Sequence, residues 1–404
     1  MKLSEELIWR GFRAETTIAD PAELDEKPRK FYLGADPSAD SLTIGNLAAL
    51  MMAACFVRHG YVPFLLVGGA TGQIGDPKET GERELKSIDE VNRNKAAIGA
   101  QMKRVLDVPN LTMVDNYDWF SKINYLDFLR EVGKNFSMTQ LLDRQFVQAR
   151  IGEGGSGISY AEFSYTLIQG YDFLHLYREY GVDLQLCGAD QFGNCTSGIH
   201  LIRRVAGGKA DAWSTPLVID PVSGRKFGKS EGNAVWLDST KTPVLDFYQF
   251  WVGQPDEAVE QLLKFYTTYT REEFDEIMAK HAVDAAARIA QKALAKGVTE
   301  VVHGREAAEL MERLSGVLFD KEVDYGFIVD NSNLICKYMP NVHVGVNLSE
   351  AMVATGVTNS KTEARKLMQS GAVMFNGEKV MEDKVLTDVG LIKKGKNKFI
   401  LVRE

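Results

Sequence analysis

The sequence predicts an α/β fold in which a doubly wound parallel sheet is followed by a helical domain and a small α+β domain. Short apolar runs separated by helical segments over residues 31–219 indicate the parallel sheet. Helical periodicity rich in Glu, Ala, Lys and Leu covers residues 244–318. Residues 361–404 are basic, with ten Lys and Arg against six Asp and Glu, which sets this tail apart from the rest of the chain.

The length of 404 residues exceeds one typical core, so we expect more than one domain. We place the domains at residues 1–242, 243–320 and 341–404. The tail has a net charge of +4, whereas the whole chain has −8. Because whole-chain charge averages over domains, the acidic total does not exclude a nucleic-acid partner for the tail.

A strand, a helix and a second strand follow one another in the first domain. We expect a strand at Phe31–Leu33, a helix from about Ile44 to His59 and a strand at Val62–Val67. This order forms a βαβ unit, which requires parallel strands and places ligands beyond their carboxyl ends. Further strands are expected at Leu111–Val114, Leu184–Cys187 and Pro216–Ile219.

The composition indicates a soluble globular protein located in the cytoplasm. The longest apolar stretches, such as residues 48–57, are too short to span a bilayer, and the N-terminus has no signal-peptide core. We therefore expect no membrane partner. The four cysteines lack C-x-x-C spacing, which argues against a disulfide framework or a zinc site, so no metal site is predicted. The cysteines are Cys55, Cys187, Cys195 and Cys336.

Two segments have features of phosphate-binding motifs. Residues 36–46, with the sequence DPSADSLTIGN, stand where a strand turns into a helix, so backbone N–H groups and the positive helix end favour an anion. Residues 226–230, KFGKS, place Lys226 and Lys229 around a glycine and end in the hydroxyl of Ser230. The second segment alone could be a solvated basic turn. Together the two segments point to ATP.

A helix over residues 163–174 carries a polar stripe. Tyr165, Gln169 and Asp172 stand at positions i, i+4 and i+7, so they share one helix face. This stripe could also be an ordinary solvated surface. Downstream, the segment 188–194, GADQFGN, follows a strand, and its alternative interpretation is a simple helix cap.

In this order, the two phosphate-type motifs resemble the signatures of class I aminoacyl-tRNA synthetases. The residues between them resemble the tyrosyl enzymes of bacterial and organellar type, over nearly the whole chain. The resemblance implies a Rossmann-like catalytic domain and a ligase that converts tyrosine and ATP into tyrosyl-adenylate, then transfers the tyrosyl group to the 3′ end of the tRNA for tyrosine. It also implies Mg²⁺ carried with ATP and a homodimer, with Tyr160 and the segment after Gly152 at the dimer seam.

The resemblance also assigns the tyrosine pocket. It implies that Tyr165 and Gln169 hold the α-amino group, that Asp172 accepts the phenol proton, and that Tyr32 bonds the same phenol oxygen. A phenol hydroxyl donates one hydrogen bond and accepts others, so a carboxylate and a hydroxyl satisfy it. The related tryptophanyl enzymes are an alternative, but an indole N–H only donates, so Tyr32 with Asp172 favours tyrosine. Other pocket positions matched by the resemblance are Thr71, Asp76, Asn116 and Gln191.

The ATP side departs from the family pattern. The usual first histidine of the signature is Thr43 here, and a common second histidine is Asn46, so donors to the polyphosphate are altered. This departure leaves open a second hypothesis, a catalytically weakened RNA-binding or regulatory paralogue. Intact Lys226, Lys229, Asp190 and Tyr32 favour the enzyme. The resemblance implies catalytic roles for Lys226, Lys229, Ser230, Thr43, Asn46 and Arg83, and ATP contacts for Gly34, Asp36, Ser38, Gly45, Gly188 and Asp190.

The tail resembles a small RNA-binding module that is shared with a ribosomal small-subunit protein. The matching stretches lie within residues 349–380, and Asn376-Gly377 in this region predicts a hairpin turn. A basic helix and a lysine-rich segment beside it would face RNA phosphates, although such a cluster can also be a solvated surface. The expected RNA-binding residues are Lys361, Arg365, Lys366, Lys393 and Lys394.

Overall fold

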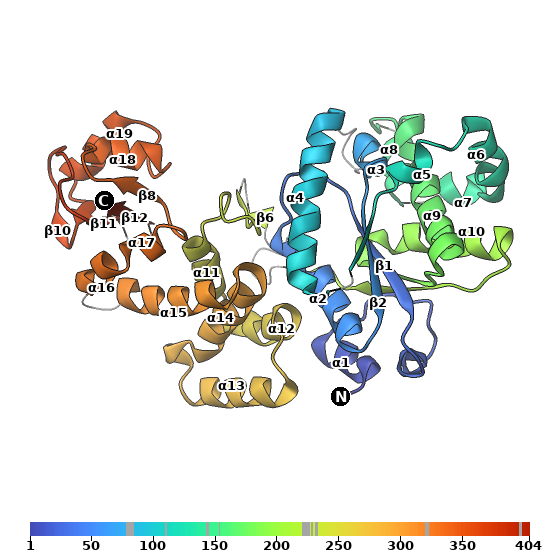
Figure 1. Cartoon of the computed structure of the whole chain (residues 1–404), viewed down its shortest axis with the longest axis horizontal. Helices are drawn as coiled ribbons and strands as arrows, with labels where there is room; N and C mark the ends of the chain where they lie inside the picture. Colours follow the sequence, from blue (N-terminus) through green and yellow to red (C-terminus); the bar gives the residue numbers. More distant parts are fainter. Residues whose placement is uncertain are drawn as a thin grey trace. The chain divides into compact units, whose positions relative to one another are not determined.

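A computed structural model describes residues 1–77, 85–109, 111–142, 145–152, 154–219, 227, 229–230, 233–319, 323–395 and 398–404. The chain divides into two units (Figure 1). The first contains Met1–Leu237 with Lys264–Tyr266, and the second contains Asp238–Leu263 with Thr267–Glu404.

A five-stranded parallel sheet forms the centre of the first unit. Its strand order is β3-β2-β1-β4-β5, so the order reverses between β1 and β4. This point of reversal is where doubly wound folds bind ligands. The strands are β1 Lys30–Ala35, β2 Val62–Val67, β3 Thr112–Val114, β4 Leu184–Gly188 and β5 Asp211–Thr215.

The long helices cover both sides of this sheet. In Figure 1, α4 lies on one side of the strands, and α9 and α10 lie together on the other. The first βαβ unit has the expected order and nearly the expected bounds, so the predicted fold class is confirmed. The four long helices are α2 Ile44–Arg58, α4 Ile88–Leu106, α9 Tyr160–Tyr180 and α10 Phe192–Val205.

The strand predicted at Pro216–Ile219 is wrong, because β5 lies just before it at Asp211–Thr215. Polar residues of β5 are buried with partners: Asp211 accepts from Arg29 at 2.9 Å, and Ser214 donates to the Glu15 carbonyl at 2.7 Å. The apolar run that suggested a strand is more exposed, with Ile219 48 % accessible. Satisfied hydrogen bonds therefore allow a polar strand in the core.

Short elements complete the first unit. The helix α9, which carries the polar stripe, begins at a Ser159 cap that accepts from the Glu162 N–H, and it ends at Gly181 in the left-handed region with φ of 66°. The other elements are α1 Leu3–Arg10, η1 Pro21–Asp25, α3 Thr71–Ile74, α5 Tyr117–Phe120, α6 Tyr125–Glu131, η2 Gly133–Asn135, α7 Met138–Leu142, α8 Gln145–Ile151, η3 Ala189–Gln191, β6 Lys229–Ser230 and β7 Asn233–Ala234.

Helices make up the first part of the second unit, as the periodicity predicts. The stretch 320–340, where the sequence shows only weak patterning, also contains two short helices. The helices are α11 Val244–Val252, α12 Asp256–Tyr266, α13 Arg271–Val283, η4 Ala285–Ala287, α14 Ile289–His303, α15 Arg305–Phe319, α16 Tyr325–Asp330 and α17 Ser332–Ile335.

The tail forms a small α+β module with a sheet of order β10-β9-β11-β12-β8. Asn376 and Gly377 both have positive φ, 46° and 84°, which is the conformation of the predicted hairpin turn. Its elements are β8 Asn341–His343, α18 Leu348–Ala354, α19 Lys361–Gln369, β9 Val373–Phe375, β10 Glu378–Lys379, β11 Gly390–Lys394 and β12 Lys398–Arg403.

All four cysteines are free in the structure, and three of them, Cys55, Cys187 and Cys195, are buried. Within the described part of the chain, no helix combines the length and apolar character needed to cross a membrane.

Candidate active site

A cavity of about 630 Å³ lies at the carboxyl ends of the strands in the first unit. This is the position that a doubly wound sheet favours for ligands. The cavity brings together fifteen of the residues predicted for the site, from segments far apart in the sequence. They are Tyr32, Gly34, Asp36, Ser38, Thr43, Gly45, Asn46, Thr71, Asp76, Tyr165, Gln169, Asp172, Gly188, Asp190 and Gln191.

The second phosphate-type motif is described only in part. Lys226 and Arg83 lie outside the described residues, and for Lys229 and Ser230 the structure describes the backbone, which forms β6. The segment that follows this motif pairs with the first motif: the Ile44 N–H donates to the Val235 carbonyl at 3.1 Å, and the Leu237 N–H donates to the Leu42 carbonyl at 2.9 Å. Backbone hydrogen bonds therefore join the region after the second motif to the first.

Asp172 is a buried carboxylate with two strong donors. The indole Nε1 of Trp119 donates to its Oδ1 at 2.9 Å, and Nδ2 of Asn116 donates to its Oδ2 at 3.1 Å. Burial raises the pKa of Asp172 well above its usual value, and the two donors oppose that shift by stabilising the charged form. The two donors therefore hold the carboxylate in one orientation at the cavity wall.

Sequence reasoning missed Trp119, and it placed Asn116 on the pocket surface. Asn116 is instead fully buried behind the cavity wall, where it also donates to Thr71 Oγ1 at 3.1 Å and accepts from the Ala70 N–H at 2.7 Å. A tryptophan three residues after a polar residue gives no local signal of a hydrogen bond to a distant helix. The contact depends on how α5 packs against α9.

Tyr32 faces the same cavity from β1 with a buried hydroxyl. Its ring packs edge-on against Phe173 at 5.2 Å, and its hydroxyl forms no hydrogen bond of normal geometry with the described residues. Burial raises the pKa of this hydroxyl well above its usual value, so it stays protonated and can donate. Gln169 Oε1 is likewise buried without a partner among these residues. Such groups are costly unless a bound molecule completes them.

A second group of polar side chains surrounds the carboxylates Asp36 and Asp76. The Tyr165 hydroxyl donates to Asp36 Oδ2 at 2.7 Å, and Gln191 Nε2 donates to Asp76 Oδ2 at 3.0 Å. Burial and then the Asp36 charge raise the pKa of Tyr165 well above its usual value. Asp36, which we expected to contact ATP, is thus linked to the tyrosine side of the cavity. Asp36, Asp76 and Gln169 line the same cavity, and two carboxylates there suit a cationic group.

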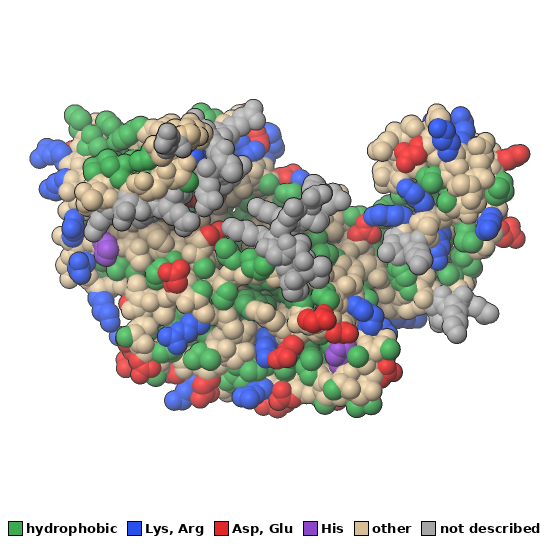
Figure 2. Space-filling model, turned by 180° about the vertical axis from the view of Figure 1, so that it is seen from behind, with side chains coloured by type: hydrophobic (Ala, Val, Ile, Leu, Met, Phe, Trp, Pro, Cys, Tyr) green, Lys and Arg blue, Asp and Glu red, His purple; other side chains and the backbone are tan. Residues whose placement is uncertain are grey.

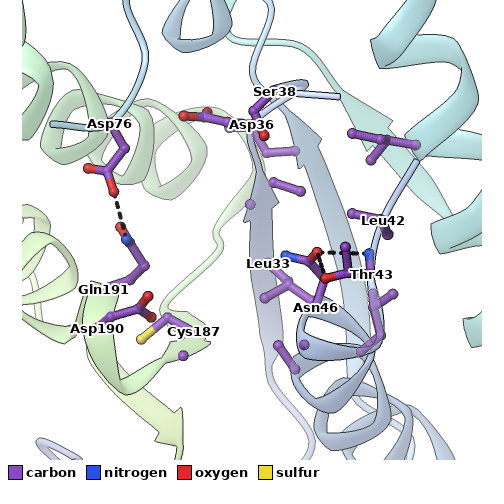
Figure 3. A pocket seen from close by; sticks show the side chains of 18 of the residues that line it. Leu33, Asp36, Ser38, Leu42, Thr43, Asn46, Asp76, Cys187, Asp190 and Gln191 are labelled. Carbon is purple, nitrogen blue, oxygen red and sulfur yellow. Dashed lines mark hydrogen bonds between the residues drawn. The ribbon is translucent and has the colours of Figure 1, made fainter. Parts of the chain in front are cut away.

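In the first motif, the two residues that depart from the family pattern, Thr43 and Asn46, form hydrogen bonds with each other. Asn46 Oδ1 accepts from both the backbone N–H and the hydroxyl of Thr43, each at 3.0 Å (Figure 3). The one hydroxyl proton of Thr43 is therefore already engaged. The Asn46 amide group has its oxygen occupied, so its Nδ2 is the donor that this pair can offer to a ligand.

Asp190 and Gln191 lie across the cavity from this pair (Figure 3). They follow Gly188 at the end of β4, where a Cβ would come within 2.9 Å of Asp190 Oδ1. A larger residue at position 188 would therefore displace the Asp190 carboxylate from its present position. No group of three or more His, Cys, Asp or Glu side chains in the described ranges is arranged to hold a metal ion.

Comparison with known proteins assigns the family. Residues 24–320 match the family model described as tRNA synthetases class I (W and Y), and residues 332–404 match the tyrosine–tRNA ligase SYY-like C-terminal domain. The chain belongs to the tyrosyl-tRNA synthetase family. The predicted family, function and enzyme class are therefore confirmed.

Full-length relatives agree with this tyrosyl-tRNA synthetase assignment. The chain is 39 % identical to the tyrosine–tRNA ligase of Limosilactobacillus reuteri, with 100 % of this chain and 97 % of the relative covered. It is 40 % identical to tyrosine–tRNA ligase 2 of Bacillus cereus, with the same coverage. A C-terminally truncated mitochondrial tyrosyl-tRNA synthetase of Aspergillus nidulans superposes with a TM-score of 0.70 at 29 % identity, over 79 % of this chain and 94 % of that one.

In the C-terminal module of this synthetase, most of the predicted RNA-binding residues have local partners. Lys361 pairs with Glu350 at 2.6 Å, and Arg365 pairs with Asp383 at 3.2 Å. Lys394 donates to a backbone carbonyl, and Lys393 lies over the Phe399 ring. Lys366 is exposed on α19 and forms no ion pair with the described residues. The positive charge that these residues can offer to RNA is therefore smaller than their number suggests.

Proposed function

We propose that this tyrosine–tRNA ligase recognises its amino acid through the phenol hydroxyl, with Asp172 as acceptor and Tyr32 as donor. The observation that carries the proposal is that one cavity is faced by a buried carboxylate and by a buried hydroxyl that has no partner among the described residues. Together they satisfy a group that both donates and accepts. An indole N–H would leave the Tyr32 hydroxyl unpaired, which favours tyrosine over tryptophan.

The α-amino group of tyrosine would bind at the other carboxylates. An ammonium has three donors, and the acceptors closest to this role are Asp76, Gln169 Oε1 and the Tyr165 hydroxyl oxygen. Asp36 holds Tyr165 and adds negative charge. This arrangement would direct the substrate carboxylate toward Gln191 and the ATP side.

Activation of tyrosine would then proceed by direct displacement. A carboxylate oxygen of tyrosine bonds to the α-phosphorus of ATP, the bond from this phosphorus to the bridging oxygen breaks, and pyrophosphate leaves. The chain's contribution would be positioning and stabilisation of the negative charge that grows on pyrophosphate. Asn46 Nδ2 and Ser38 would donate from the first motif, Asp190 would bind the ribose, and Mg²⁺ would enter with ATP as part of the substrate.

The second motif and the segment before α4 would supply further cations to the same polyphosphate. Lys226, Lys229, Ser230 and Arg83 remain predictions, because these side chains are outside the described structure. The adenylate would pass its tyrosyl group to a 3′-terminal ribose hydroxyl of the tRNA, which the module at residues 341–404 would help to bind.

Pyrophosphate exchange tests the proposed recognition. The purified full chain should exchange pyrophosphate into ATP in the presence of tyrosine, far more slowly with phenylalanine, and not measurably with tryptophan. Equal exchange with tyrosine and phenylalanine would contradict the roles of Asp172 and Tyr32. Absence of exchange with any amino acid would favour the inactive-paralogue hypothesis.

We also propose a cytoplasmic homodimer. Exposed apolar side chains gather over the short helices α5–α8 and the start of α9, at the upper left of Figure 2. An apolar patch of this kind favours burial against another protein surface. Its exposed residues are Tyr117, Tyr125, Leu126, Met138, Leu142, Ile151 and Tyr160. Sedimentation equilibrium of the full chain tests the proposed dimer. The double variant Leu126→Asp, Tyr160→Asp should lower the measured molecular mass from that of two chains to that of one.

A further inference from the structure

Gln185 is a buried polar residue in the middle of β4. It pairs directly with Tyr32 of β1 in the parallel register, and paired residues on neighbouring strands point to the same face of a sheet. Both residues are only 2 % exposed, and both line the cavity. Gln185 is therefore the strand neighbour of Tyr32, whose hydroxyl we propose as donor to the phenol.

Gln185 is buried in the wall of the cavity. A buried amide is destabilising unless its hydrogen bonds are made. Gln185 Oε1 has no hydrogen-bond partner among the described residues. Packing does not explain why a polar residue occupies this position. This indicates that the amide completes its hydrogen bonds when a ligand fills the cavity.

The Gln185 amide and the Tyr32 hydroxyl belong to paired residues of neighbouring strands that line the same cavity. Burial is the largest influence on the pKa of Tyr32 and raises it, whereas hydrogen bonding from Gln185 acts in the opposite direction. That sign is the one given by an amide N–H that donates to the phenolic oxygen. Among the described residues, neither the Tyr32 hydroxyl nor Gln185 Oε1 has a hydrogen-bond partner.

We propose that Gln185 is a positioning residue: its amide N–H donates to Tyr32 Oη and directs the Tyr32 proton at the phenol oxygen of the substrate. This inference rests on the proposed roles of Tyr32 and Asp172. The bonds then run in one direction, from Gln185 to Tyr32, from Tyr32 to the phenol, and from the phenol to Asp172. Without Gln185, the Tyr32 hydroxyl can turn away, and the phenol oxygen loses its donor.

A double-mutant cycle on the full chain tests this. Gln185→Met should lower kcat/KM for tyrosine in pyrophosphate exchange by about tenfold and leave that for phenylalanine within about twofold. In the Tyr32→Phe background, the same change should have less than about a twofold effect, because the group through which Gln185 acts is gone. Leu184→Met, on the other face of β4, is the matched control and should leave the tyrosine-to-phenylalanine ratio unchanged.

Gln185→Glu provides a second variant of the same shape. When protonated, its carboxyl can donate to Tyr32, but when ionised it can only accept. The tyrosine-to-phenylalanine ratio relative to the parent should therefore fall as pH rises. The titratable groups around this position are Tyr32 on β1, Asp172 on α9, Cys187 on β4 and Cys195 on α10, and they are the same in both proteins.

Two results would overturn the inference. One is a full effect of Gln185→Met in the Tyr32→Phe background, which would show that Gln185 acts elsewhere. The other is an unchanged amino-acid ratio in both Gln185 variants. If Tyr32→Phe by itself leaves the ratio unchanged, the proposed recognition of the phenol fails instead, so the two failures are distinguishable.

Discussion

The cavity end around Asp172 is built from side chains on β1, α5 and α9, whereas the end around Thr43 is held by backbone pairing with residues 235–237. At the first end, buried donors fix a carboxylate. At the second, the Thr43 and Asn46 side chains bond each other and leave one amide to face the ligand. The difference suggests that selection among amino acids depends on rigid buried groups, while phosphate chemistry depends on donors presented by motif segments.

The largest expected effect is at the buried end. Asp172→Asn should reduce kcat/KM for tyrosine by about 100-fold, because a hydrogen bond to a charged acceptor is lost and the phenol proton has a poorer partner. The ratio of kcat/KM for tyrosine to that for phenylalanine should therefore decrease. Pyrophosphate exchange with both amino acids measures this. Asp127→Asn, an exposed carboxylate on α6, is the control and should have no effect. An unchanged ratio of kcat/KM for tyrosine to that for phenylalanine in Asp172→Asn would contradict the view that the buried end of the cavity selects the amino acid.

At the phosphate end, we expect Asn46 to matter more than Thr43. Asn46→Ala should lower the single-turnover rate of adenylate formation by about 10- to 100-fold with little change in tyrosine affinity, because the donor acts on charge that develops in the transition state. Thr43→Ala should cost less than about tenfold, since the Thr43 backbone N–H still holds Asn46 Oδ1. A larger loss in Thr43→Ala than in Asn46→Ala would reverse this assignment.

Trp119→Phe should have a moderate effect that depends on pH. Recognition needs Asp172 ionised, so kcat/KM for tyrosine should fall as pH decreases through the raised pKa of Asp172. Removing the indole donor raises that pKa further, so the acidic limb should move to higher pH, with a loss of about 5- to 10-fold at neutral pH. A pH series of pyrophosphate exchange measures the limb, with Trp9→Phe as control. If the acidic limb of the pH profile stays at the same pH, the hydrogen bond from Trp119 does not lower the pKa of Asp172.

The smallest effect is expected outside the cavity. Lys366→Ala on the exposed face of α19 should weaken tRNA binding a few-fold and reduce the slope of log K against log salt by about one, while tyrosine activation stays unchanged. Lys361→Ala should change the slope less, because Lys361 already pairs with Glu350. Filter binding across a salt series compares the two variants. Equal slopes for both and for the parent would show that α19 does not contact tRNA.

The sequence alone predicts whatever depends on neighbours along the chain. The βαβ order, the shared face of Tyr165, Gln169 and Asp172 on α9, and the Asn376-Gly377 turn follow from strand alternation, helical spacing and local backbone preference. The first phosphate-type motif could likewise be placed between the end of a strand and the start of a helix. These features are properties of short segments, so tertiary packing did not alter them.

Only the tertiary structure decided which distant groups complete one another. The polar strand β5 is stable because Arg29 and the Glu15 carbonyl reach it, Asp172 is held by Trp119 from another helix, and Gln185 meets Tyr32 through the register of two strands. Local patterns do not contain these pairings, because a buried polar residue looks like a misplaced one until its partner is known. The physical reason is that burial makes each unpaired polar group costly, and the partner that removes this cost is supplied by the fold.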